Sequence, residues 1–275
     1  MATVTTPTTP AGWSPDLVSF PPADTVGDAV VLQASTLVGS IEGDEPSVRC
    51  PFVSDDGSPG FVDEGAQIGD AEQAFSETVI TTGKLATVGK YSFETLAQQN
   101  AAQLITQSLN RSIVTAADEA FLGNSSDPLG LLNTSGIVDG GSVGSNLDSV
   151  VDVVSGIEAA GGQATHVIAA PDAWATLSKL KTGTDSEMSL IGAGTTDAVR
   201  SLLGVPVLVT PAMPEASLLV LDNRAVLRAE SPVRVARSDQ AFFSSDVVAV
   251  RVAWRLGWSL QRPDRVAKLT TTTEE

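Results

Sequence analysis

The clearest hydrophobic pattern in the chain is a two-residue alternation near the C-terminal end. Apolar residues occupy the even positions from Val248 to Leu260, and Arg251 and Arg255 stand at odd positions between them. Because successive side chains of a strand point to opposite faces, this pattern predicts a long strand with one buried face and one polar, basic face. We expect this strand to pair with residues 233–235 in a sheet.

A second periodic segment runs from Ser92 to Gly123. Its apolar residues recur every 3.6 residues, Ser92 is a suitable N-cap, and Gly123 with Asn124 ends the pattern. A helix of about 30 residues would be roughly 45 Å long. The charged e and g positions of a coiled coil are absent. We therefore expect a spine helix that packs on the predicted sheet of a flat, elongated domain.

Before this helix, the sequence predicts a long hairpin. Two extended runs, residues 48–53 and 75–88, flank a tip at residues 60–69, so the hairpin would occupy residues 47–91. A two-stranded hairpin is only marginally stable alone in water. We expect this one to lie on another subunit.

Between the spine helix and the C-terminal strand, residues 145–222 have the pattern of a compact α/β module. Helical periodicity gives way to short apolar runs that are typical of strands. The expected elements are a helix over 147–157, a strand over 165–170, a helix over 171–180, a loop over 182–196, and strands over 205–209 and 218–221.

The two ends of the chain carry weaker signals. Five prolines interrupt the first 22 residues, which predicts an extended arm over residues 1–46, with a short helix over 29–37. Residues 270–275 are expected to be a frayed tail. The predicted fold class is α+β.

Acidic and basic residues are distributed unevenly along the chain. The 275 residues carry a net charge of −17, which argues against a sequence-reading nucleic-acid protein, because phosphate binding needs a basic surface. Residues 1–90 hold 13 acidic and 3 basic residues, whereas residues 224–268 hold 4 acidic and 9 basic residues. An acidic front and a basic back suit head-to-tail contacts between identical subunits.

Candidate chemistry is sparse. Cys50 and His166 are the only residues of their types, so neither an intrachain disulfide nor a usual structural zinc site is expected. His166 stands in an apolar strand pattern, which favours a structural role over a catalytic one. The acidic pairs at 55–56 and 63–64 lack EF-hand spacing, and residues 192–197 lack the lysine of a P-loop. The sequence predicts no catalysis, cofactor, metal site, export signal or membrane span.

The order of these elements, together with several short motifs, resembles the Hong Kong 97-type major capsid protein of tailed bacteriophages. The resemblance covers about residues 48–269, and no single motif is specific, whereas their order is. The motifs are FVDEG at 61–65, FSETVI at 75–80, KLA at 84–86, ADEAFLGN at 117–124, DPLGLL at 127–132, GVPV at 204–207, MP at 213–214, LD at 221–222, and residues 242–255.

The resemblance implies a division of the chain and a subunit contact. Residues 1–46 would be an N-terminal arm, 47–91 an extended loop, 92–144 with 223–275 a peripheral domain, and 145–222 an axial domain. The acidic loop would lie over basic strands of a neighbour. The predicted assembly residues are Asp63, Glu64, Asp70, Glu72, Arg234, Arg237, Arg251 and Arg255.

The same resemblance implies the partners. Copies of the chain would form hexamers and pentamers of an icosahedral head that encloses double-stranded DNA without sequence-specific binding, with a portal protein and no membrane. The protein would be made in the host cytoplasm and reside in the virion. Residues 60–74 hold no lysine for the covalent cross-link of some members, and the family's fused scaffolding segment is missing. We therefore expect a non-covalent shell that a separate cement protein reinforces, and either a separate scaffolding protein or an arm that itself guides assembly.

Two other functions stay open on the sequence. An encapsulin-like nanocompartment shares the fold, but that family begins with a cargo-binding helix, whereas this chain begins with a Pro/Thr-rich segment. A small α/β hydrolase using His166 is the alternative from a different class, and large particles would exclude it.

Overall fold

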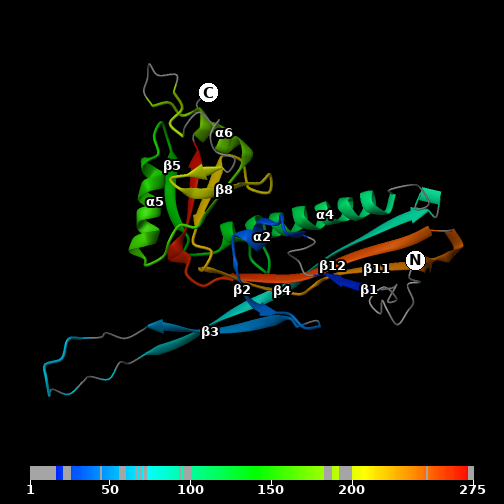
Figure 1. The fold of residues 1–275 in the computed structure, drawn as a ribbon, viewed down its shortest axis with the longest axis horizontal. Coiled ribbons are helices and arrows are strands. Elements are labelled where there is room, and N and C mark those ends of the chain that lie inside the picture. Colours follow the sequence, from blue (N-terminus) through cyan, green and yellow to red (C-terminus); the bar gives the residue numbers. More distant parts are fainter. Residues whose placement is uncertain are drawn as a thin grey trace, which may run out of the picture.

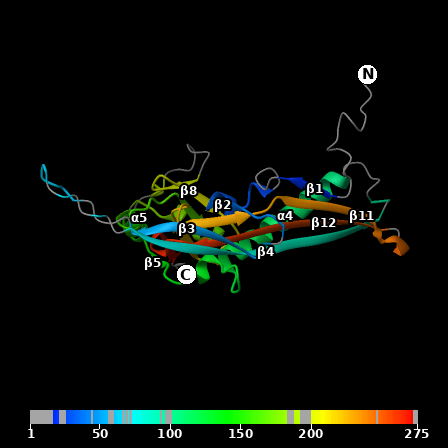
Figure 2. The same cartoon turned by 90° about the horizontal axis from the view of Figure 1, so that it is seen from below.

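The computed structural model describes residues 17–20, 26–43, 45–55, 60–65, 67, 70, 73–92, 94–95, 101–182, 188–191, 200–245 and 247–271. Two sheets and one long helix dominate it. The first sheet runs along the length of the molecule, and the second stands with its helices above one end of the first (Figure 1). The side view shows the elongated outline that the spine prediction requires (Figure 2).

The centre of the first sheet is β12 (Val247–Leu260). On one side it pairs antiparallel with β11 (Val233–Phe242) and β10 (Val226–Glu230), and on the other with β4 (Ala74–Ser92). The sheet is completed by β1 (Leu17–Phe20) on β11, by β2 (Thr36–Ser40) on β10, and by β3 (Ser47–Asp55) on β4.

The two strongest periodic patterns correctly predicted a strand and a helix. Of the even positions of β12, Val248, Val252, Trp254, Leu256 and Trp258 are buried. The spine is α4 (Ala101–Gly123), which ends at the predicted glycine and packs on this face, with the rings of Phe121 and Trp258 5.4 Å apart and edge to face. Residues 94–95 are also helical, and Ser92 Oγ accepts the N–H of Thr95 at 3.2 Å, as an N-cap does.

The hairpin differs from the prediction in one respect. Residues 74–81 of β4 pair with β3, but the rest of β4 continues into the first sheet, where residues 82–92 pair with β12. Gly257 lies at this transition, and a Cβ there would come within 2.2 Å of the Thr81 carbonyl oxygen. The hairpin is thus a direct extension of the main sheet, not a separate excursion.

The second sheet has the strand order β5-β13-β9-β6-β8-β7. The helices and strands predicted for the α/β module between residues 147 and 221 are present, but its sheet is larger than predicted, and most of the loop predicted over 182–196 lies outside the described residues. Strands from outside the module, β5 and β13, complete it, and residues 270–271 belong to β13 and are not frayed. The elements are β5 (Val138–Val143), α5 (Asp148–Ala159), β6 (His166–Ala169), α6 (Pro171–Lys179), β7 (Ser201–Leu202), β8 (Val205–Val209), β9 (Ser217–Leu221) and β13 (Val266–Thr271).

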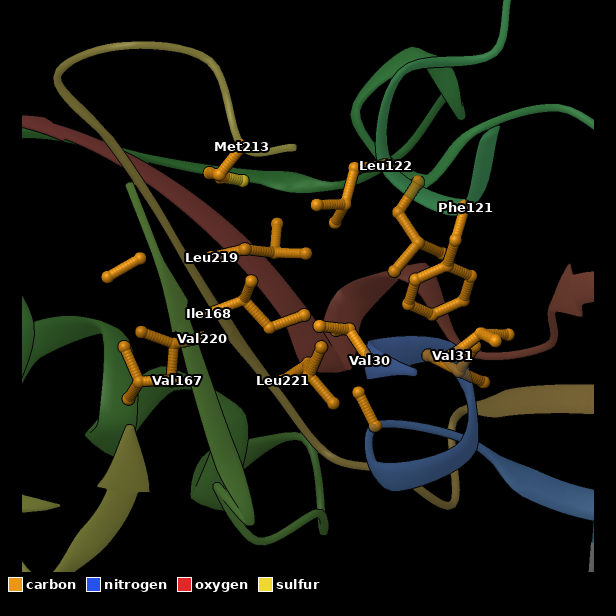
Figure 3. Close-up of a cluster of buried hydrophobic side chains, with 14 of the residues drawn as sticks. Val30, Val31, Phe121, Leu122, Val167, Ile168, Met213, Leu219, Val220 and Leu221 are labelled. Atoms are coloured by element: carbon orange, nitrogen blue, oxygen red, sulfur yellow. The ribbon is translucent and has the colours of Figure 1, made fainter. Parts of the chain in front are cut away.

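One hydrophobic core joins the two sheets. Figure 3 shows the side chains of Phe121 and Leu122 from α4 facing a cluster that contains Leu219 and Leu221 of β9. Short 3-10 turns lie between consecutive elements: η3 (Leu131–Asn133) between α4 and β5, η4 (Phe243–Ser245) between β11 and β12, and η5 (Pro263–Arg265) between β12 and β13.

Residues 26–43, before the hairpin, are more structured than the predicted extended arm, whereas residues 1–16 and 21–25 of that arm lie outside the described residues. The helix predicted over 29–37 is the single turn α2 (Val30–Gln33), which is followed by strand β2. Val30 and Val31 are buried in the shared core (Figure 3). Two distant side chains hold the turn: Asp118 Oδ1 accepts the N–H of Val30 at 2.7 Å, and Arg228 donates to the carbonyls of Leu32 and Ser35 at 3.1 and 2.6 Å. Residues 26–41 are therefore part of the body.

Candidate assembly surfaces

The hairpin formed by β3 and β4 projects from one end of the molecule (Figures 1 and 2). At its tip, the Phe61 side chain is fully exposed, at 112% of the reference area, and Val62, Asp63 and Glu64 are also exposed. Asp70 is exposed as well, whereas Glu72 lies outside the described residues. An exposed aromatic residue beside two carboxylates is typical of a contact surface.

The root of the hairpin is fixed by packing and by hydrogen bonds. Ile41, Ile80, Leu227 and Ala229 form a small buried cluster there. The N–H of Thr82 donates to the carbonyl of Pro46 at 2.9 Å, which continues the ladder beyond β3. These contacts set the direction in which the hairpin leaves the sheet.

The face of the first sheet opposite α4 carries cations. Directly opposed residues share a face, so the register places Arg251 of β12 between Ala236 of β11 and Val88 of β4. We call this surface the basic face. Its side chains are Lys84, Ala86, Val88, Lys90, Arg234, Ala236, Arg251, Ala253 and Arg255.

The four predicted arginines have different roles. Arg234 and Arg251 are exposed on the basic face. Arg255 is half-buried, and its Nε donates to the Glu45 carbonyl at 3.1 Å and to Thr82 Oγ1 at 3.0 Å, so it braces the hairpin root. Arg237 pairs with Val250 and therefore points to the other face, separate from the rest of the set.

Sequence reasoning missed Lys84 and Lys90 on this face. Both are exposed, and the Lys90 Nζ lies 4.1 Å from the centre of the Phe242 ring. The alternation of residues 84, 86, 88 and 90 was visible in the sequence, but their pairing with β12 was not. Within the described part of the chain, Lys84, Arg234 and Arg251 have no ion-pair partner, so their charges are available to another molecule.

The acids and the basic face do not meet within one chain. The hairpin tip lies at one end of the molecule, whereas β11 and β12 extend toward the other (Figure 1). Contact between the two surfaces therefore requires two copies.

The side chains that could take part in catalysis or metal binding are isolated from one another. His166 Nδ1 lies 3.2 Å from Thr165 Oγ1, and burial lowers the pKa of this histidine. Burial raises the pKa of the Cys50 thiol. Among the described residues no three His, Cys, Asp or Glu side chains are grouped as metal ligands, and no helix is long and apolar enough to cross a membrane.

The fold is that of solved capsid subunits. The chain is similar to a structure of Gordonia phage Cozz (TM-score 0.71, 16% identity, 90% of this chain and 87% of that one). It is also similar to the capsid of a native GTA particle (0.70, 19%, 90% and 91%) and to Microbacterium phage Oxtober96 (0.70, 14%, 98% and 100%). This is the Hong Kong 97-type capsid fold.

The family follows from the sequence. The model of the phage capsid family matches residues 31–271, and the chain belongs to this family. No curated protein matches the chain in a sequence comparison. The protein is a structural capsid protein of the virion that assembles with copies of itself, and these matches do not favour the encapsulin alternative.

Proposed function

We propose that this protein is the major subunit of a tailed-phage head, forming hexamers and pentamers that enclose double-stranded DNA. The observation that carries the proposal is the projecting hairpin. Its tip exposes Phe61 and Val62 and buries neither against its own subunit. A subunit that holds such an arm by a rigid root is built to be covered by a neighbour.

The hairpin tip of one copy docks on the basic face of the next. Asp63 and Glu64 supply the negative charge, and Arg234, Arg251 and Lys84 supply the positive charge. Val88, which is 54% exposed in the middle of the basic face, offers an apolar surface for Phe61. The contact combines an aromatic anchor with surrounding charge pairs, and the charges determine orientation more than affinity.

The best test reverses exposed cations of the basic face. Arg251→Glu and Arg234→Glu should each abolish or strongly reduce particle formation while the melting temperature stays within a few degrees of that of the wild type. Arg237→Glu is the matched control, because it makes the same charge change on β11 but on the opposite face. Arg255 is unsuitable, since its reversal would break the bonds to Glu45 and Thr82 inside one subunit.

A charge swap provides the complementary test. Asp63→Lys with Glu64→Lys should also block assembly, and mixing this variant with Arg251→Glu should restore mixed particles. Assembly of the Arg251→Glu variant alone at wild-type concentration would show that the basic face is not the receiving surface.

The division of the chain fits this function. In the proposed division, residues 1–46 form the N-terminal arm, of which 26–41 are anchored in the body. Residues 47–91 are the extended loop, residues 92–144 with 223–275 the peripheral domain, and residues 145–222 the axial domain at the capsomer centre, whose sheet is completed by β5 and β13 from the flanking segments.

The other proposed partners are those that a shell enclosing a genome requires. A net charge of −17 repels DNA, which suits a container that must release its contents. The shell would contain a portal protein, would be made in the host cytoplasm, and would be non-covalent, with separate scaffolding or cement proteins as partners. It would have no enzymatic role. Nucleic acid inside purified particles supports this assignment, whereas enclosed cargo enzymes would contradict it.

A further inference from the structure

The turn between β7 and β8 carries an unusual residue. Leu203 and Gly204 have φ angles of 52° and 80°. A two-residue turn with both φ angles positive normally uses Asn-Gly, because a leucine is strained in left-handed backbone. The Leu203 side chain is also 49% exposed. A strained and exposed leucine brings little benefit to an isolated subunit, which indicates a role outside it.

The opposite edge of the same sheet has a groove. It runs along β5 and β13, encloses about 450 Å³, and is lined by Leu132, Ile137 and Val138 together with the charged residues Asp139 and Lys268. The Val138 side chain is 42% exposed. Since the strand order begins with β5 and ends with β7, the groove and Leu203 lie on opposite sides of the sheet, as the positions of β5 and β8 indicate (Figure 2).

The strand register places the Leu203 turn level with the start of the groove. One row of paired residues crosses the sheet from β8 to β5, through Val207, Val167, Val220, Ala267 and Val138. Because β8 and β5 point in the same direction, the turn before β8 and the loop before β5 lie on the same side of this row. Leu203 precedes Val207, so a neighbour placed alongside brings its turn level with the part of the groove that precedes Val138, which is lined by Leu132 and Thr134.

We propose that Leu203 of one copy inserts into the groove beside Leu132 and Thr134 of the next copy and links these sheets head to tail. This inference rests on the proposed function, and it assigns the contact within each hexamer or pentamer. A head-to-tail contact uses two different surfaces, so rotation closes it into a ring. Arg200, at the start of the turn region, is exposed and has no ion-pair partner among the described residues; it pairs with Asp139 across the contact.

Two substitutions of Leu203 separate this role from a structural one. Leu203→Asn suits the left-handed turn, so the melting temperature should be equal to or above that of the wild type, while the protein concentration needed for rings should rise at least ten-fold. Leu203→Met keeps the apolar side chain and should form rings within about three-fold of the wild-type concentration. Ring formation by Leu203→Asn at the wild-type concentration overturns the inference.

Cross-linking tests the contact directly. In a Cys50→Ser background, Leu203→Cys combined with Thr134→Cys should give a disulfide ladder up to the pentamer or hexamer on a non-reducing gel, and either single variant should give none. The two sites lie on opposite edges of one sheet, so an intrachain bond cannot form. Rings or shells without the ladder contradict this inference but leave the proposed function intact, whereas absence of rings, tubes and shells from the wild type contradicts both.

Discussion

The carboxylate of Asp118 accepts a hydrogen bond of 2.7 Å from the backbone N–H of Val30, a residue 88 positions earlier in the chain. Asp118 stands on the spine helix α4, and Val30 begins the one-turn helix α2. At the other end of this turn, Arg228 of β10 donates to the Leu32 and Ser35 carbonyls. A carboxylate at the start and a guanidinium at the end complement the polarity of the turn and attach residues 26–41 to the body.

Asp118 makes the stability of this attachment depend on pH. Burial raises the pKa of the Asp118 carboxyl from 3.8 to about 6, although its hydrogen bonds with Val30 and Val31 act to lower it. Because the folded pKa lies above the unfolded value, the stability from the protonated carboxyl is fully present below pH ~4 and is lost as the pH rises through ~6. The loss amounts to roughly 3 kcal/mol.

The check is urea unfolding of the wild type and Asp118→Asn at pH 4 and pH 7.5. The variant keeps an oxygen acceptor for Val30 but does not titrate. We expect it to gain roughly 3 kcal/mol of stability relative to the wild type over this interval. An equal pH dependence of the two proteins would show that Asp118 is not the responsible group.

The two tryptophans of β12 should respond differently to replacement by phenylalanine. Trp258 donates from Nε1 to the Leu129 carbonyl at 2.8 Å, whereas the buried Nε1 of Trp254 has no hydrogen-bond partner among the residues that the structure describes. Both changes remove similar volume, but only Trp258→Phe leaves a carbonyl unpaired. We expect Trp258→Phe to cost about 1–2 kcal/mol more in the free energy of unfolding. Equal losses in denaturant titrations would contradict the assigned hydrogen bond.

Gly257 should not tolerate a side chain, because it lies where β4 changes from pairing with β12 to pairing with β3. Its Cβ would lie 2.2 Å from the backbone oxygen of Thr81, so Gly257→Ala should cost about 3 kcal/mol or more. Gly89→Ala in the facing strand is the control, because there the nearest atoms belong to the Tyr91 side chain, which can rotate away. Thermal unfolding measures both, and a smaller loss for Gly257→Ala than for Gly89→Ala would contradict the packing at this point.

Elements with strong local periodicity could be predicted from the sequence, and elements formed by distant pairing could not. The alternation of β12 and the period of α4 are local, and each was placed within a few residues. Strand β5 contains two adjacent glycines and has no strand pattern, yet it forms because β13 pairs with it. Similarly, α2 depends on Asp118 and Arg228, which no local pattern connects to it.

The candidate surfaces could likewise be predicted only as far as local sequence patterns reach. The charge polarity of the chain indicated that tip and strands would attract each other, and alternation placed Arg251 on the polar face of its strand. The three-residue spacing between Arg234 and Arg237 should have separated them, because an odd spacing in a strand changes the face. Lys84 and Val88 joined the basic face only through the register of β4 with β12.

The most direct test of the account is electron microscopy of the purified protein expressed alone, with particle mass measured on the same sample. We expect capsomer rings, tubes or closed icosahedral shells in which each projecting hairpin crosses a neighbouring subunit. A protein that remains a monomer at high concentration, both alone and in a crowding agent, would contradict the claim that this chain is a self-assembling shell subunit.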